Sequence, residues 1–251
     1  MTDAGARARG AGAGGGGDAR AGAAADAGDS IARAAAAAAA VELVEPGMVI
    51  GLGSGRAVWK LVELLGERGS DVRVAVASTR TDELVRAAGL DVVELDGELE
   101  LDLCLDGADE VDPRLRLIKG GGGALLREKI LVCAARRFVV VAETPKRVER
   151  LGESFRLPVE VVRFAWRDTR RRLARLLPDT RLRLGEGDEP YVTDEGHLIL
   201  DCAIPADADV DALALALAQV TGVVEHGLFI EQAERALLGR PDGGVEVLER
   251  A

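Results

Sequence analysis

Residues 101–136 read LDLCLDGADEVDPRLRLIKGGGGALLREKILVCAAR, and this stretch decides the fold. It begins as a strand, because leucines at 101, 103 and 105 alternate with other residues and the run stops at Asp106 and Gly107. A short apolar piece at 115–118 then leads to Lys119. Four consecutive glycines follow, and a helix pattern starts at Ala124. The order predicts a buried strand, a glycine-rich loop and a helix, as in α/β proteins.

The polar residues of this stretch indicate proton transfer at a carbon next to an oxygen. Such a reaction needs a carboxylate that moves a proton, and Asp106, Asp109 and Glu128 are candidates. It also needs positive groups near the oxygen that becomes negative, and Lys119 and the glycine N–H groups at a helix N-terminus supply these. Either half alone is more often a solvated acidic loop or a flexible turn. The ordered combination favours a catalytic site.

The same residues resemble the signature of the type A family of ribose-5-phosphate isomerase. The matching motifs are DGADE at 106–110 and KGGGGALLREK at 119–129, and the resemblance continues more weakly from Ile31 to Val247. It implies that ribose 5-phosphate and ribulose 5-phosphate are interconverted through an enediol or enediolate, without a metal or cofactor. It also implies a small sugar-phosphate ligand and a homodimer or a dimer of dimers.

The resemblance further implies a role for each motif residue. Glu128 is expected to be the general base, Asp106 and Asp109 to act on the sugar hydroxyls and in ring opening, and Lys119 to stabilise the enediolate oxygens with the glycine N–H groups. The remaining substrate-binding residues that it implies are Ser54, Gly55, Arg56, Ala57, Gly107, Ala108, Gly120, Gly121, Gly122, Lys146 and Arg33.

The loop GLGSGRA at 51–57 follows a short apolar strand and precedes a helix, which is the form of a phosphate site. It is not a dinucleotide motif, because Arg56 stands where the third glycine is required, and it lacks the G-K-[ST] of a Walker A loop. The isomerase family usually has G-[ST]-G-S-T here, so a guanidinium and a methyl group replace two hydroxyls. We expect Arg56 to hold phosphate by charge. Lys146 and Arg33 are either phosphate ligands or solvated surface charges.

The order of elements predicts the fold class. Strands at 48–52, 72–77, 90–95, 101–105 and 137–142 alternate with helices at 57–65 and 82–88 and after 124, which predicts a Rossmann-like, mostly parallel sheet with helices on both faces. After residue 151 the order becomes β-α-β-β-α-β, with strands that include 191–193, which predicts a smaller α+β, ferredoxin-like domain.

These patterns give a division into domains. Residues 1–29 are rich in alanine and glycine with almost nothing large to bury, so we expect a disordered tail and a first helix that starts at Ser30. Residues 30–151 together with 227–251 are expected to form the Rossmann-like catalytic domain, and residues 152–226 the smaller domain.

Composition excludes several classes. The net charge of −11 argues against a nucleic-acid partner, and no apolar run approaches the length of a membrane span. The three cysteines form no C-x-x-C pair, which favours free thiols in a reducing cytosol, and the two histidines have no nearby ligand partner. Two alternatives to an isomerase stay open: a sugar-phosphate sensor without turnover, and an acyl-coenzyme A transferase of related topology, whose glutamate context does not match 119–129.

Overall fold

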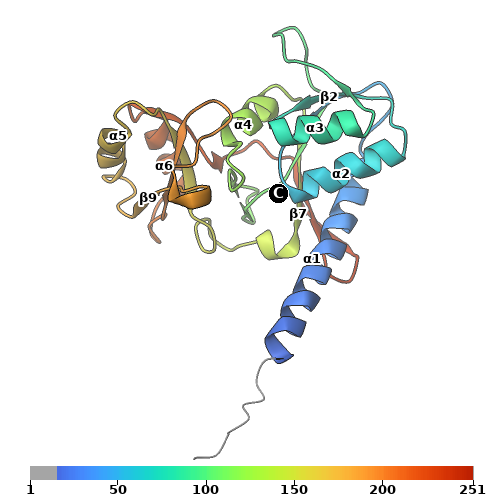
Figure 1. Cartoon of the computed structure of the whole chain (residues 1–251), viewed down its shortest axis with the longest axis horizontal. Helices are drawn as coiled ribbons and strands as arrows, with labels where there is room; N and C mark the ends of the chain where they lie inside the picture. Colours follow the sequence, from blue (N-terminus) through green and yellow to red (C-terminus); the bar gives the residue numbers. More distant parts are fainter. Residues whose placement is uncertain (1–15, 251) are drawn as a thin grey trace, which may run out of the picture.

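The computed structural model describes residues 16–250, and its largest sheet is seven-stranded (Figure 1). The strand order is β14-β13-β7-β4-β1-β2-β3, and all neighbouring strands are parallel except β13 and β14. The strands are β1 (Val49–Leu52), β2 (Arg73–Val76), β3 (Asp91–Val92), β4 (Leu103–Asp106), β7 (Phe138–Glu143), β13 (Arg235–Gly239) and β14 (Val245–Glu249). The predicted Rossmann-like, mostly parallel sheet is therefore confirmed.

Both faces of this sheet are covered. Helices α1 (Gly16–Val41), α2 (Arg56–Glu67) and α3 (Thr79–Ala87) lie over one face, and α4 (Leu125–Cys133) over the other. Because side chains alternate along a strand, Ile50 and Leu52 of β1 pack into the first cluster and Val49 into the second. All four residues of β1 are buried, as expected for a central parallel strand.

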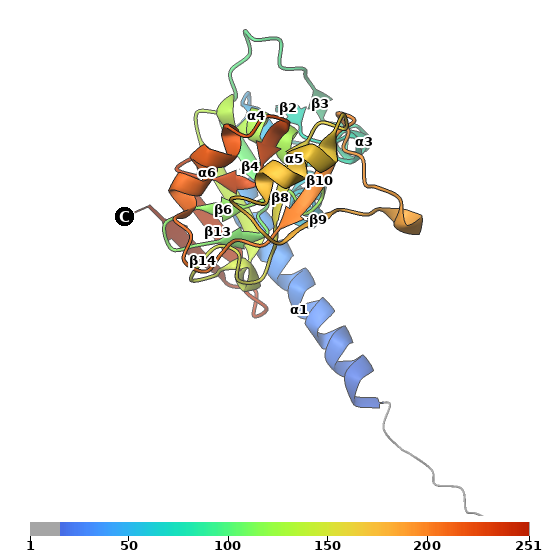
Figure 2. The same ribbon diagram turned by 90° about the vertical axis from the view of Figure 1, so that its left-hand side faces the viewer.

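A second unit carries its own antiparallel sheet (Figure 2), and it has its own apolar cluster. Its strand order is β11-β8-β10-β9, which is the ferredoxin-like order, and α5 and α6 connect the strands. The elements are β8 (Leu157–Val161), α5 (Trp166–Leu173), β9 (Thr180–Leu182), β10 (Leu198–Cys202), α6 (Val210–Ala218) and β11 (Val223–His226). The predicted β-α-β-β-α-β order is confirmed.

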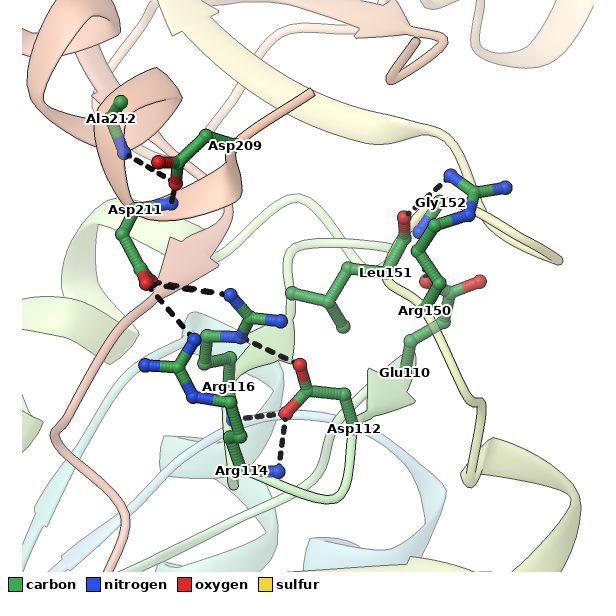
Figure 3. A network of polar contacts seen from close by, with 10 residues as sticks. All are labelled: Glu110, Asp112, Arg114, Arg116, Arg150, Leu151, Gly152, Asp209, Asp211 and Ala212. Atoms are coloured by element: carbon green, nitrogen blue, oxygen red, sulfur yellow. Dashed lines mark hydrogen bonds and ion pairs between the residues drawn. The ribbon is translucent and has the colours of Figure 1, made fainter. Parts of the chain in front are cut away.

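A third, three-stranded sheet joins the two units, and the sequence did not indicate it. It consists of β5 (Glu110–Val111), β6 (Leu117–Ile118) and β12 (Leu228–Phe229), all antiparallel. The acidic residues of this region are buried instead of solvated, since Asp112 accepts from Arg116 Nε at 2.6 Å and from two backbone N–H groups. Arg116 also contacts Asp211 of α6, which ties the units together (Figure 3).

Three local expectations were wrong. Helix α1 starts at Gly16, not at Ser30, because alanine favours a helix even where nothing large is buried. The N-terminal half of this helix extends away from the body of the molecule (Figures 1 and 2). The expected disorder at residues 1–15 lies outside the described residues. Strand β3 ends at Val92, shortly before Asp96 turns the chain by accepting from the N–H groups of Glu98 and Leu99. Residues 191–193 contribute only an isolated bridge at Val192.

The 3-10 helices η1 (Thr144–Lys146) and η2 (Glu186–Asp188) complete the elements. Within residues 16–250, no helix is both long and apolar enough to cross a bilayer.

Candidate active site

A cavity of about 360 Å³ opens where β1, β4 and β7 end, at the carboxyl edge of the parallel sheet. Ligands of open α/β sheets bind at this edge. Nearly all of the expected site residues line it: Ser54, Gly55, Arg56, Ala57, Gly107, Ala108, Asp109, Lys119, Gly120, Gly121, Gly122, Glu128 and Lys146. Asp106 and Arg33 are the two expected residues that do not.

The floor of the cavity is a buried cluster of charged side chains. Lys119 Nζ lies 2.7 Å from Asp106 Oδ2 and 3.2 Å from Glu128 Oε2, and it donates to the carbonyl oxygen of Gly107 at 2.7 Å. The exposed fractions are 0% for Asp106, 2% for Lys119 and 4% for Glu128. One buried lysine therefore faces two carboxyl groups away from bulk water, and its single positive charge can balance only one of them.

Burial sets the protonation of this cluster. Burial, reinforced by the negative charge of Asp106, raises the pKa of Glu128 to about 8, although Lys119 opposes the shift. Burial also raises the pKa of Asp106, against the opposing charge of Lys119. Burial acts to lower the pKa of Lys119, but the two carboxylates outweigh it and hold that pKa above its ordinary value. Glu128 is thus a carboxylate that exchanges a proton near neutral pH, as a general base requires.

Asp106 acts from behind the cavity. Its Oδ1 accepts from the N–H groups of Ser54 at 3.2 Å and Gly107 at 2.7 Å, and its Oδ2 faces Lys119. A side chain at position 53 would collide with it, because a Cβ there would lie 1.8 Å from Asp106 Cγ, which explains Gly53. Asp106 therefore fixes the phosphate-type loop and Lys119 relative to each other, and the expectation that it reaches sugar hydroxyls does not fit this position.

The glycine loop, residues 120–123, forms one wall. Asp109 Oδ2 accepts from the N–H of Gly121 at 2.7 Å, which aligns this carboxylate along the cavity. The N–H of Gly122 has no acceptor among residues 16–250, and Gly122 lines the cavity. This wall offers a carboxylate and a free amide to a ligand.

The opposite end of the cavity is positively charged. Arg56 begins α2 and is exposed, Lys146 ends η1, and neither side chain has a hydrogen-bond or ion-pair partner within the described part of the chain. The helix N-terminus and the two cations together suit a phosphate group. Arg33 does not line the cavity itself, but its Nε donates to Glu143, which does, at 2.8 Å.

Sequence reasoning missed Trp59, Val141, Glu143 and Phe155, which also line the cavity. Phe155 comes from the segment that precedes β8, where buried Glu110 accepts from the N–H groups of Gly152, Ser154 and Phe155 at 2.6–2.8 Å. No local pattern signals this contact, because the partners are separated by more than forty residues. Glu143 was detectable in principle, as the polar residue that ends β7 at the same edge.

Parallel strands that end around a buried acid–base carboxylate, a lysine and a cationic loop define an α/β enzyme site for proton transfer on a small anion. A family model for ribose 5-phosphate isomerase A (phosphoriboisomerase A) matches residues 73–243. The ribose-5-phosphate isomerase A of Roseiflexus castenholzii is 49% identical over 212 residues, which cover 82% of this chain and 91% of that protein. The chain belongs to the ribose 5-phosphate isomerase A family.

Solved structures agree in fold. The ribose 5-phosphate isomerase A of Methanocaldococcus jannaschii has a TM-score of 0.81 at 36% identity and covers 86% of this chain and 97% of its own. A D-ribose-5-phosphate isomerase solved in complex with phospho-erythronic acid also has a TM-score of 0.81 at 36% identity, with coverages of 87% and 97%.

Proposed function

We propose that this chain interconverts D-ribose 5-phosphate and D-ribulose 5-phosphate, a step of the non-oxidative pentose phosphate pathway. The observation that carries the proposal is the buried Glu128–Lys119 pair at the floor of a cavity that is cationic at its other end. Membership in the family supports the choice of substrate. The buried Glu128 favours turnover over a sensor that only binds, since a pKa raised to about 8 suits a group that exchanges protons.

The proposed reaction moves one proton between two carbons of the open-chain sugar. Glu128 removes the proton from C2, the electron pair forms the C1–C2 double bond, and the carbonyl oxygen on C1 becomes negative. Lys119 and the glycine-loop N–H groups stabilise this enediolate oxygen. The proton of the C2 hydroxyl is then transferred to the negative oxygen on C1, the electron pair left on the C2 oxygen forms the C2=O carbonyl, and Glu128 returns its proton to C1. The product is the ketose, and atoms and charge balance.

The remaining residues hold the substrate. Asp109 is proposed to accept from the sugar hydroxyls and to assist ring opening, because its carboxylate lines the cavity beside the glycine loop. The loop at 53–57 and Lys146 are proposed to bind the phosphate. Asp106 is proposed as a positioning residue that acts through Lys119, and Arg33 as one that acts through Glu143.

The first test is direct: purified protein is incubated with ribose 5-phosphate in the presence of EDTA, and ketose is measured. Glu128→Gln is expected to fold and to lose more than about 1000-fold in kcat, because the amide cannot take the proton. Glu63→Gln, at an exposed position of α2, is the matched control and keeps its activity. Absence of ketose with the unchanged chain would refute the activity, whereas full turnover by Glu128→Gln would refute the base assignment alone.

We also propose a cytoplasmic homodimer or dimer of dimers. Several large apolar side chains are exposed, notably Phe164 at 89% and Leu215 at 74%, and they are available for a subunit contact. The cysteines are free thiols, as is usual in a reducing compartment. Sedimentation equilibrium measures the assembly, and a monomer at micromolar concentration would contradict it.

A further inference from the structure

We infer that Arg183 and Tyr191 of the smaller unit are positioning residues for the glycine loop, and that Arg183 aims the N–H of Gly122 at the reacting oxygen. The inference rests on the proposed isomerase activity. Both residues are more than sixty positions away from the loop in the sequence, and they reach it from the segment around β9.

Arg183 binds two successive carbonyl groups of the loop. Its Nη1 donates to the oxygens of Gly120 at 2.8 Å and Gly121 at 3.0 Å. The rest of the guanidinium is held by Asp201 of β10, because Nε donates to Asp201 Oδ2 at 3.0 Å and Nη2 to Oδ1. The Arg183 side chain is only 13% exposed. The guanidinium is therefore fixed at both ends.

Tyr191 holds the next carbonyl group. Its hydroxyl donates to the oxygen of Gly122 at 3.2 Å, and a Cβ on Gly123 would lie only 2.2 Å from that hydroxyl. The Arg183 guanidinium lies 6.0 Å from the centre of the Tyr191 ring, so the two side chains approach the loop together. Three consecutive carbonyl oxygens of the loop thus face the smaller unit.

The hydrogen bonds from Arg183 and Tyr191 to the loop carbonyl groups, called the clamp below, also fix the direction of the loop N–H groups. In a trans peptide, the C=O of one residue and the N–H of the next point in opposite directions. Arg183 holds the oxygen of Gly121, and it therefore directs the N–H of Gly122 the other way. That N–H has no acceptor among residues 16–250, and Gly122 lines the cavity. Asp109 already engages the neighbouring N–H, that of Gly121.

The expected effect is on rate more than on binding. A displacement of about 1 Å in a catalytic group costs on the order of 100-fold in rate. We therefore expect Arg183→Met to lower kcat by about 10- to 100-fold. The KM for ribose 5-phosphate should change less than about threefold, because the phosphate end of the cavity is built from α2 and η1.

Three measurements separate positioning from general structural damage. Arg181→Met is the matched control, since Arg181 lies in β9, is 69% exposed and pairs with Asp179 instead of the loop. The Ki of phospho-erythronic acid should rise in Arg183→Met in proportion to the fall in kcat/KM. Methylguanidinium added to Arg183→Ala should restore part of kcat. Unchanged kcat in Arg183→Met, or an equal loss in Arg181→Met, would overturn the inference.

A readout without turnover keeps the inference distinct from the proposed function. The amide of Gly122 is followed by NMR hydrogen exchange in the full-length protein and in Arg183→Met. Faster exchange and a shifted resonance in the variant support the clamp even if no ketose is formed. An unaltered Gly122 amide would refute it even in an active enzyme.

Discussion

At the scale of single residues, Glu128 determines how activity depends on pH. Its pKa is raised to about 8 by burial and by the charge of Asp106, so the carboxylate form becomes dominant only above that pH. We expect kcat/KM to rise as pH increases through about 8, far above the 4.5 of an ordinary glutamate. A rate profile from pH 5.5 to 9.5 measures this, and a flat profile between pH 6 and 9 would contradict it.

The raised pKa of Glu128 also makes the stability of the fold depend on pH, in the direction opposite to activity. The folded chain holds a proton on Glu128 between pH 4.5 and about 8, where the unfolded chain has released it. The contribution of Glu128 to the free energy of unfolding therefore falls as pH rises through this window. Glu128→Gln should remove that decline, so its stability relative to the unchanged protein should be greater at pH 9 than at pH 5.

Arg56 is the second prediction at this scale. Its guanidinium is exposed and lines the cavity beside the N-terminus of α2, where it would attract phosphate by charge. We expect Arg56→Ser to raise the KM for ribose 5-phosphate about 10-fold at low salt and to make KM less dependent on salt, because exposed charges are screened. Michaelis constants measured from 20 to 500 mM salt decide this, and an unchanged KM would remove Arg56 from the site.

At the scale of elements, the glycine loop needs glycine at some positions and merely tolerates it at others. Gly123 has φ of +86° and no space for a Cβ beside Tyr191, whereas a Cβ on Gly122 would meet nothing within 4 Å. We expect Gly123→Ala to cost about 2 kcal/mol or more of unfolding free energy and Gly122→Ala less than about 0.5 kcal/mol. Urea denaturation of the pair measures the difference, and equal costs would contradict the steric argument.

Elements also show where sequence reasoning stops. The alternation at 101–105 predicted β4, and the run at 119–129 predicted α4. The motifs at 51–57, 106–110 and 119–129 together predicted most of the cavity wall, because strand period and loop chemistry are local. The two-residue strands β5 and β6 are too short for a period to appear. Asp106 is paired with Lys119, which lies 13 residues away in the sequence. Arg183 binds the loop at Gly120, which lies 63 residues away. Nothing in the local sequence specifies such pairings.

At the scale of the whole molecule, three apolar clusters make up the core, and one of them belongs mainly to the ferredoxin-like unit. The cavity draws on both units, since Phe155 and the clamp on the glycine loop come from residues beyond the large sheet. Their relative placement therefore matters for the site. The polar network of Figure 3 is one of the links that set it.

The two acidic residues of that network should differ in their contribution because they differ in burial. Asp112 is 1% exposed and accepts from Arg116 Nε and from the N–H groups of Arg114 and Arg116, so its removal leaves buried donors without partners. We expect Asp112→Ala to cost about 3 kcal/mol of unfolding free energy. Asp211 is 38% exposed and lies 3.4 Å from the same arginine, so Asp211→Ala should cost less than about 1 kcal/mol.

The dependence of the two losses on salt concentration sharpens this comparison. The loss in Asp211→Ala should shrink at 0.5 M salt, because an exposed pair is screened, whereas the loss in Asp112→Ala should persist. Each stability is obtained from urea denaturation at both salt concentrations. If Asp211→Ala were as costly as Asp112→Ala, the contact between α6 and Arg116 would be stronger than its exposure allows, and the link between the units would depend on the ion pair itself. If the order holds, the backbone around β5 and β6 depends on Asp112, and Asp211 contributes only a screened attraction between the units.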